Sequence, residues 1–280
     1  MNRRNIALGL VLTVGGLGVA AHNLLSFQVD AAGAKGMARA WIASTGTEIG
    51  IDSEVQGKVS GLAELGIDQA APVLSAIYQN LSAIEGAGSD AKAAQARVDD
   101  LGRELAALVD VKDRVVAEAG KSLQPHERAG IIAKMGKHFH DQFHPTPEAV
   151  EGILQSLRAA HESAVKQELK LDDARAKALF SAMDVYAKQH HEVRDARRAL
   201  YEKLSGAVTA NASDTTLAPL LADWDKLTAR QSDITRAQIA EAGKQFTLAE
   251  KVQLLTHAKQ RLDRVMRVVA LIARFAPVKG

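Results

Sequence analysis

Three histidines lie within seven residues of one another, at His138, His140 and His144. The last two are four residues apart, so on a helix they share a face and both rings could bind one divalent ion. Imidazole suits transition metals such as Zn, Cu, Ni or Co, and His138 is a further candidate ligand. The competing interpretation is structural, because protonated histidines also interact favourably with the C-terminal dipole of the helix that Pro145 should end.

Residues 246–250, with the sequence Phe-Thr-Leu-Ala-Glu, carry the chemistry of a helix start. The hydroxyl of Thr247 can cap the first turn, and Glu250 can reach back to the backbone N–H of Thr247. Phe246 precedes the cap, where an apolar residue fixes the direction of the chain as the helix begins. The same pattern, which we call the start motif, occurs 123 residues earlier, where it begins at Leu123 and ends at Glu127.

Two looser versions of the start motif place an apolar residue before a good capping residue. They are Leu171 with Asp172, and Ile67 with Asp68. The four start motifs divide the chain into two halves, and each half has a long helical hairpin between its motifs. Counted from Leu65 to Leu123 the spacing is 58 residues, and from Leu169 to Phe246 it is 77, so we expect the second hairpin to be longer or to carry an extra turn.

Composition favours helices throughout. The chain has 280 residues, of which 47% are hydrophobic and only 4% aromatic, so few residues prefer strands. The glycines of residues 86–88 and the polar stretch 211–216 should break the helices, and between such breaks apolar residues recur at helical spacing. We therefore predict an all-α protein of long helical hairpins, made of two divergent copies of one helical unit. Cysteine is absent, which excludes a disulfide framework and a thiolate site.

The N-terminus resembles a targeting segment. Arg3 and Arg4 precede an apolar or small run, and residues 19–21 offer the small residues of a cleavage site. We expect a cleaved signal peptide or, alternatively, an uncleaved inner-membrane anchor, and either places the remaining chain in the periplasm. The expected division is residues 1–21 for this segment, 22–64 for a poorly defined stretch, 65–168 for the first helical unit and 169–280 for the second.

An apolar residue and a threonine that open an amphipathic helix, with Gln or Glu three residues after the threonine, resemble the LTxxQ motif. This motif belongs to the Spy/CpxP family of periplasmic stress proteins and to the related heavy-metal sensors of the CnrX type. Residues 246–250 are the best match, with Phe for Leu and Glu for Gln, whereas residues 123–127 lack the threonine. The motif residues are Leu123, Glu127, Leu171, Asp172, Phe246, Thr247 and Glu250.

The resemblance implies small helical hairpins that dimerise into a curved cradle, so two copies in one chain would form such a pair intramolecularly. It also implies that a basic and apolar face binds unfolded proteins without ATP. Candidate client-binding residues are Phe139, Phe143, Arg261, Arg264 and Arg267. The related sensors use a His pair spaced as here, but the position is not clearly equivalent, so no metal ligands are transferred.

We thus expect an ATP-independent chaperone-like protein that binds unfolded or membrane-associated proteins in envelope stress and requires no cofactor. A metal sensor or metal-binding protein, and a membrane-tethered structural protein, are the alternatives. The basic last helix could also contact an anionic membrane surface, or simply present a solvated face. Two of the 35 lysines and arginines lie in residues 1–21, and the others balance the 33 acidic residues, which argues against nucleic-acid binding. No catalytic motif is present, and we expect no enzyme activity.

Overall fold

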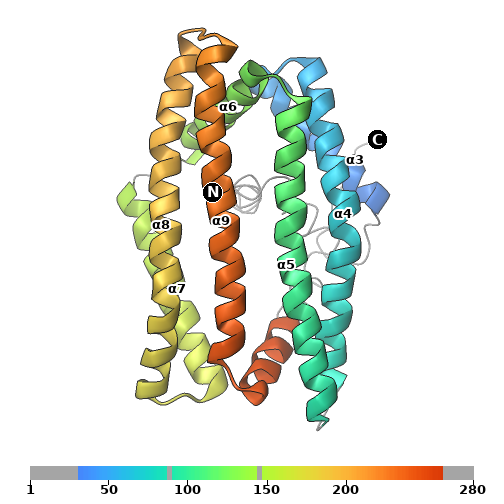
Figure 1. Cartoon of the computed structure of the whole chain (residues 1–280), viewed down its shortest axis with the longest axis vertical. Helices are drawn as coiled ribbons and strands as arrows, with labels where there is room; N and C mark the ends of the chain where they lie inside the picture. Colours follow the sequence, from blue (N-terminus) through green and yellow to red (C-terminus); the bar gives the residue numbers. More distant parts are fainter. Residues whose placement is uncertain (1–30, 87–89, 144–146, 261–280) are drawn as a thin grey trace. The chain divides into compact units, whose positions relative to one another are not determined.

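The computed structural model describes residues 31–86, 90–143 and 147–260 (Figure 1). Every regular element in these ranges is an α-helix, which confirms the predicted all-α class. Residues 248–260 are helical as well and are drawn in red in Figure 1. The helices with defined bounds are α3 (Ala31–Glu48), α4 (Ser53–Gly86), α5 (Ala91–Ser122), α6 (Pro125–Phe143), α7 (Pro147–Leu169), α8 (Asp173–Thr209) and α9 (Asp214–Gln245).

Most helix ends lie where local chemistry predicts them. Pro125 and Pro147 are the first residues of α6 and α7, a position that proline tolerates because its missing N–H would have no partner there. The side chain of Asp172 caps α8 by accepting a hydrogen bond from the N–H of Arg175 at 2.8 Å. Asp90 caps α5 in the same way through the N–H of Ala93 at 3.0 Å.

The helix start predicted at Ile67 and Asp68 is wrong, because α4 runs through both residues without a break. Ile67 is 1% exposed and packs in a small apolar cluster with α3, so tertiary burial keeps this stretch helical. Asp68 caps nothing and instead accepts a hydrogen bond from Lys35 at 2.7 Å. The true start of α4 lies 16 residues earlier, where Asp52 accepts a hydrogen bond from the N–H of Glu54 at 2.8 Å.

The turns before α4 and α8 have the same geometry. Gly50 has a φ of 67° and Lys170 a φ of 52°, both in the left-handed region. The N–H of Ile51 then reaches the carbonyl five residues earlier at 2.8 Å, and the N–H of Leu171 does the same at 3.0 Å. Both turns therefore end one helix with left-handed geometry and lead directly into an aspartate cap.

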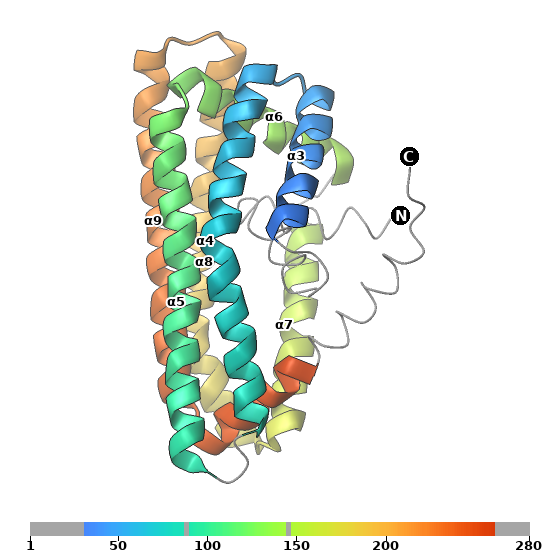
Figure 2. The ribbon, with the colours of Figure 1, turned by 90° about the vertical axis from the view of Figure 1, so that its right-hand side faces the viewer.

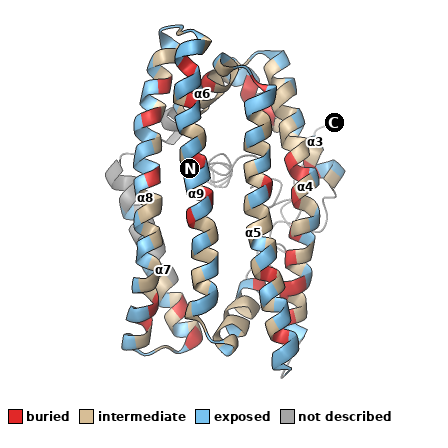
Figure 3. Ribbon diagram, viewed as in Figure 1, coloured by how far each residue is buried: buried red, intermediate tan, exposed pale blue. Residues whose placement is uncertain are grey.

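The chain divides into two compact units. Within the described ranges, unit 1 comprises residues 31–38, 63–112 and 246–260, and unit 2 comprises residues 39–62 and 113–245. The core of unit 1 is an apolar cluster between α4 and α5: Ala70, Leu74, Ile77, Leu81, Ile84, Leu101 and Val111. The core of unit 2 joins α6 to the α8–α9 hairpin: Ala129, Leu200, Leu204, Leu217 and Leu221. Figure 3 shows buried residues recurring along these helices between exposed ones.

The two hairpins match at a constant spacing of 123 residues. The spacing relates three consecutive helix boundaries: Gly86 to Thr209, Ala91 to Asp214, and Ser122 to Gln245. It also relates residues that pack in the two cores: Ile77 to Leu200, Leu81 to Leu204, Val98 to Leu221, and Leu101 to Trp224. The second hairpin is longer, as expected, but only by three residues, because α8 has 37 residues and α4 has 34, while α5 and α9 have 32 each. The larger difference implied by the spacing of the motifs came from counting from Leu65, which lies inside α4, rather than from the start of that helix.

None of the described helices combines the length and the apolar character that a membrane crossing requires. Residues 1–30, which include the predicted signal or anchor, lie outside the described ranges.

Candidate functional site

The start motif at residues 246–250 forms the capping box that its sequence predicts. The N–H of Thr247 donates to the Glu250 carboxylate at 2.7 Å, and the N–H of Glu250 donates to the Thr247 hydroxyl at 3.3 Å. The same hydroxyl lies 3.0 Å from the Glu250 carboxylate. These reciprocal contacts satisfy backbone donors that the first turn of a helix leaves without intrahelical partners.

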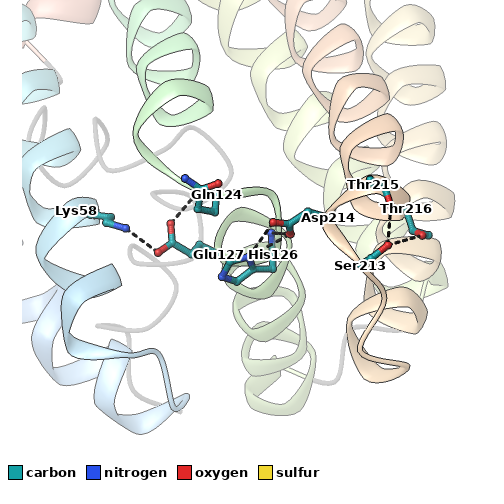
Figure 4. Close-up of polar contacts among 8 residues, drawn as sticks. All are labelled: Lys58, Gln124, His126, Glu127, Ser213, Asp214, Thr215 and Thr216. Atoms are coloured by element: carbon teal, nitrogen blue, oxygen red, sulfur yellow. Dashed lines mark hydrogen bonds and ion pairs between the residues drawn. The ribbon is translucent and has the colours of Figure 1, made fainter.

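The start motif at residues 123–127 uses half of this device and adds an ion pair (Figure 4). The N–H of Gln124 donates to Glu127 Oε2 at 2.7 Å, while Lys58 Nζ donates to Glu127 Oε1 at 2.8 Å. The Lys58 hydrogen bond, with the Gln124 N–H second, lowers the pKa of Glu127 below its ordinary value. Glu127 in turn raises the pKa of Lys58, with help from Glu54. Leu123 is buried ahead of this cap, as the pattern predicts for the apolar residue that opens the motif.

Two further contacts fasten the first turn of α6 to α9. Asp214, at the start of α9, accepts a hydrogen bond from the backbone N–H of His126 at 2.9 Å and lies 3.1 Å from His126 Nδ1. Arg128 donates to both carboxylate oxygens of Asp225, at 2.6 and 3.1 Å. The bidentate pair fixes direction as well as distance, so it positions α6 on the hairpin. Figure 4 shows His126 and Asp214 facing each other.

The helices that follow these start motifs are α6 and residues 248–260, which we call the motif helices, and they pack on different hairpins. Ala129 and Ile132 of α6 pack in the core of the α8–α9 hairpin. Val252 and Leu255, at the positions 123 residues later, pack against the core of the α4–α5 hairpin. Each unit thus combines the hairpin of one half of the chain with the motif helix of the other half.

The histidine cluster is described only in part. His138 is half-buried on α6, with Nδ1 at 3.8 Å from a carboxylate oxygen of Glu48. The side chains of His140 and His144 lie outside what the structure describes, so the predicted metal site stays a prediction. No group of three or more His, Asp or Glu side chains suited to a metal ion occurs in the described part of the chain.

The side chains of the predicted client-binding residues also lie outside what the structure describes. The structure does not describe the side chains of Phe139 and Phe143, and Arg261, Arg264 and Arg267 follow the last described residue. Their role in binding therefore stays a prediction. Of the remaining motif residues, Leu171 and Phe246 are half-buried beside their caps.

Sequence reasoning missed a polar centre between α8 and α9. Arg197 donates to Thr228 Oγ1 at 2.6 Å and to Gln231 Oε1 at 2.7 Å, and its guanidinium lies 5.4 Å from the centre of the Trp224 ring. Burial lowers the pKa of Arg197. The available signal was the arginine itself, which stands in the apolar stripe of α8 between Val193 and Leu200.

A second polar cluster ties the C-terminal part of α5 to α9. Ser232 is fully buried and donates to Asp113 Oδ1 at 2.6 Å, while Arg236 donates to Asp113 Oδ2 at 2.6 Å. A single carboxylate thus satisfies a buried hydroxyl and a guanidinium. Its pairing across 119 residues could not be read from local spacing.

What these described groups do chemically is donate and accept hydrogen bonds that position helices. Comparisons with protein-family models, with curated proteins and with solved structures returned no match. Function is therefore inferred from the residues and geometry of this chain.

Proposed function

We propose that the protein binds unfolded or aggregating proteins in the periplasm without ATP, and that it consists of two divergent copies of a Spy/CpxP-like helical unit. One observation carries the proposal. The start motifs 123 residues apart both place a glutamate carboxylate 2.7 Å from a backbone N–H, and both lead into an amphipathic helix that packs on a long hairpin.

The matching helix boundaries support the duplication. They also favour other limits for the two copies than the expected residues 65–168 and 169–280. The first copy consists of α3 to α6, and the second of α7 to the helix at residues 248–260. The same left-handed turn and aspartate cap precede α4 and α8, and the same layers of core residues follow in both hairpins. Exchange of the motif helices between the copies supports an intramolecular version of the paired arrangement that the resemblance implies.

Binding of this kind needs surface and no bond-making step. Apolar side chains contribute the affinity and basic side chains attract acidic segments of the client. Among the side chains that the structure describes, three large apolar ones are exposed, Met37, Leu105 and Val185, and they stand on three different helices. Scattered residues of this sort are normal for any protein. We therefore assign client contact to the faces that carry Phe139, Phe143, Arg261, Arg264 and Arg267.

Light scattering of a chemically denatured client, diluted into buffer without ATP, tests this function. We expect equimolar protein to suppress the rise in scattering, and a Phe139→Ala, Phe143→Ala, Arg261→Ala, Arg264→Ala, Arg267→Ala variant to lose most of this effect. A variant with Lys226→Ala and Arg198→Ala, two exposed cations elsewhere, is the matched control. Unchanged aggregation with the natural protein would rule the function out.

The proposed compartment has a separate test. We expect the mature protein to be recovered from the periplasm, and N-terminal sequencing to show whether residues 1–21 have been removed. Recovery from the cytoplasm with residue 1 in place would contradict the export part of the proposal.

A further inference from the structure

The two motif helices are fastened to their hairpins in different ways. In unit 2, the first turn of α6 is held by the His126–Asp214 and Arg128–Asp225 contacts. We call these two contacts the latch. Arg128 is 13% exposed and Asp225 is 39% exposed, so their bidentate pair is partly shielded from water and is stronger than a fully exposed pair.

The positions 123 residues away cannot form a latch in unit 1. Alanine stands at position 249 in place of His126, and at position 91 in place of Asp214. Glycine stands at position 102 in place of Asp225, and lysine at position 251 in place of Arg128. Because alanine and glycine carry no acceptor or charge, the residue types alone exclude both contacts.

Residues 248–260 contact unit 1 through an apolar pair and, further along the helix, a cation. Val252 and Leu255 pack against the α4–α5 cluster, and Figure 2 shows this helix in red beside the end of α4. Lys259 is 9% exposed, with Nζ at 3.4 Å from Glu85 Oε2 and 5.3 Å from the centre of the Tyr78 ring. The α4–α5 surface therefore accepts two apolar side chains three residues apart and a cation four residues further on.

We infer that this surface, which we call the covered surface, is a docking site for a client segment, and that residues 248–260 occupy it reversibly. The occupant is a stretch of unfolded protein with two large apolar side chains three residues apart and Lys or Arg four residues after them. Its apolar side chains replace Val252 and Leu255, and its cation replaces Lys259 at Glu85 and Tyr78. This inference rests on the proposed function and adds a second place of client contact, beside the faces that carry Phe139, Phe143 and the three arginines.

The missing latch matters because the resident helix competes with the client. A tethered segment competes at a high effective concentration, so a client gains access only in proportion to the fraction of molecules in which the helix is released. A latch in unit 1 would lower that fraction. Unit 2 has the latch and unit 1 lacks it. Of the two hairpin surfaces that carry a motif helix, the covered surface is therefore the one that a client can reach.

A peptide-binding experiment on the full chain tests the inference without any client. The probe is a fluorescent synthetic peptide with the sequence of residues 246–260. Transplanting the latch with Ala91→Asp and Ala249→His should weaken peptide binding about fivefold, which is what one carboxylate with a backbone N–H and an imidazole contributes. Releasing the resident helix with Val252→Asp and Leu255→Asp should strengthen it about tenfold or more.

Two controls keep the result specific. Ala249→His alone adds the imidazole without its carboxylate partner and should leave peptide binding unchanged. A peptide with Asp in place of both Val252 and Leu255 should not bind. If the latched, natural and released proteins bind the natural-sequence peptide equally, or none of them binds it, the inference is wrong.

The aggregation assay separates this inference from the function on which it rests. If the natural protein suppresses aggregation and the latched protein suppresses it less, both stand. If the peptide affinities follow the expected order but no protein suppresses aggregation, the function is wrong and the covered surface is not a client site. Equal suppression by the latched and natural proteins would leave the function intact and overturn the inference.

Discussion

The two hairpins have similar backbones and different interiors. Near their loops both are apolar, with Ile77 and Leu81 of α4 matched by Leu200 and Leu204 of α8. One turn further from the loop they diverge. Leu74 continues the apolar cluster of unit 1, whereas Arg197, at the matching position in unit 2, is a cation that donates to polar residues of α9.

The difference separates two requirements of a helix pair, which are stability and a fixed register between the helices. Apolar burial stabilises in proportion to the area removed from water, about 25 cal/mol per Å², but it tolerates sliding because it has no direction. Hydrogen bonds from a guanidinium demand one geometry and add little net stability once desolvation is counted. We therefore expect α4–α5 to depend on its apolar layer for stability, and α8–α9 to use Arg197 to fix its register.

Moving the cation to the apolar hairpin should have the largest effect. Leu74→Arg places a charge in an apolar cluster, with leucine at the three positions that match Trp224, Thr228 and Gln231, and we expect a loss of about 4 kcal/mol or more in the free energy of unfolding. Urea unfolding followed by far-UV circular dichroism measures this. Leu105→Arg is the matched control, because Leu105 is 36% exposed and should tolerate arginine within about 1 kcal/mol. Equal losses at the two sites would show that the interior of unit 1 is not selectively apolar.

Removing the carboxylate at Asp113 should have the next largest effect. Asp113→Ala leaves the buried hydroxyl of Ser232 and the guanidinium of Arg236 without this acceptor, so we expect a loss of about 2 to 3 kcal/mol in urea unfolding. Asp223→Ala, which breaks an exposed pair with Lys226, should cost less than about 0.5 kcal/mol. A result at Asp113 as small as this control would mean that polar contacts in unit 2 do not define its packing.

The glutamates of the two start motifs should differ by a smaller amount. Glu127→Ala loses both a cap and the Lys58 pair, for which we expect about 1 to 2 kcal/mol, while Glu250→Ala should cost about 0.5 to 1 kcal/mol for its capping box. Thermal or urea unfolding of the two variants at neutral pH gives the comparison. If Glu250→Ala proves the more costly, the Lys58 pair does not strengthen the motif at residues 123–127.

The Glu127 contribution should also depend on pH in a defined direction. The folded pKa of Glu127 is lowered by Lys58 first and by the Gln124 N–H second. Its contribution is therefore complete above the unfolded pKa of about 4.3 and is lost as the pH falls through the lower folded pKa. The difference in stability between the natural protein and Glu127→Ala should shrink over that acid range and stay constant between pH 6 and 8, roughly.

Replacing the polar pair by the residues of the other hairpin should have the smallest effect. Arg197→Leu with Gln231→Leu recreates the leucines found at positions 74 and 108, and we expect stability to change by less than about 1 kcal/mol or to rise. Arg197→Leu alone should be less stable than the double variant, because Gln231 loses its donor. A loss of about 3 kcal/mol or more in the double variant would contradict a mainly register-fixing role.

Helix ends could be predicted from the sequence where the capping side chain and the N–H group that it binds lie within a few residues of each other. The caps at Asp172 and Thr247 and the prolines that begin α6 and α7 follow from the N–H groups of the first helical turn. The same logic failed at Ile67 and Asp68, because a cap competes with continuation of the helix. Burial of Ile67 against α3 favours continuation, and no local pattern reveals that burial.

The candidate site shows the same limit. The sequence predicts that Glu127 reaches back to residue 124, and it does, but nothing near residue 127 indicates Lys58 as its second partner. The polar centre at Arg197 was visible only as an arginine in an apolar stripe. Whether such a residue is a solvated side chain or a buried donor depends on the opposite helix, which here supplies Thr228 and Gln231.

The sequence by itself determined the helical class, most helix ends and the two glutamate caps, because each depends on contacts spanning about four residues. Tertiary structure decided which hairpin receives each motif helix. The apolar pair Ala129 and Ile132 and the pair Val252 and Leu255 have the same spacing, so pattern alone would let either helix pack on either hairpin. The contacts that distinguish them, Arg128 with Asp225 in unit 2 and Lys259 with Glu85 in unit 1, join residues far apart in the chain and exist only once the helices have packed.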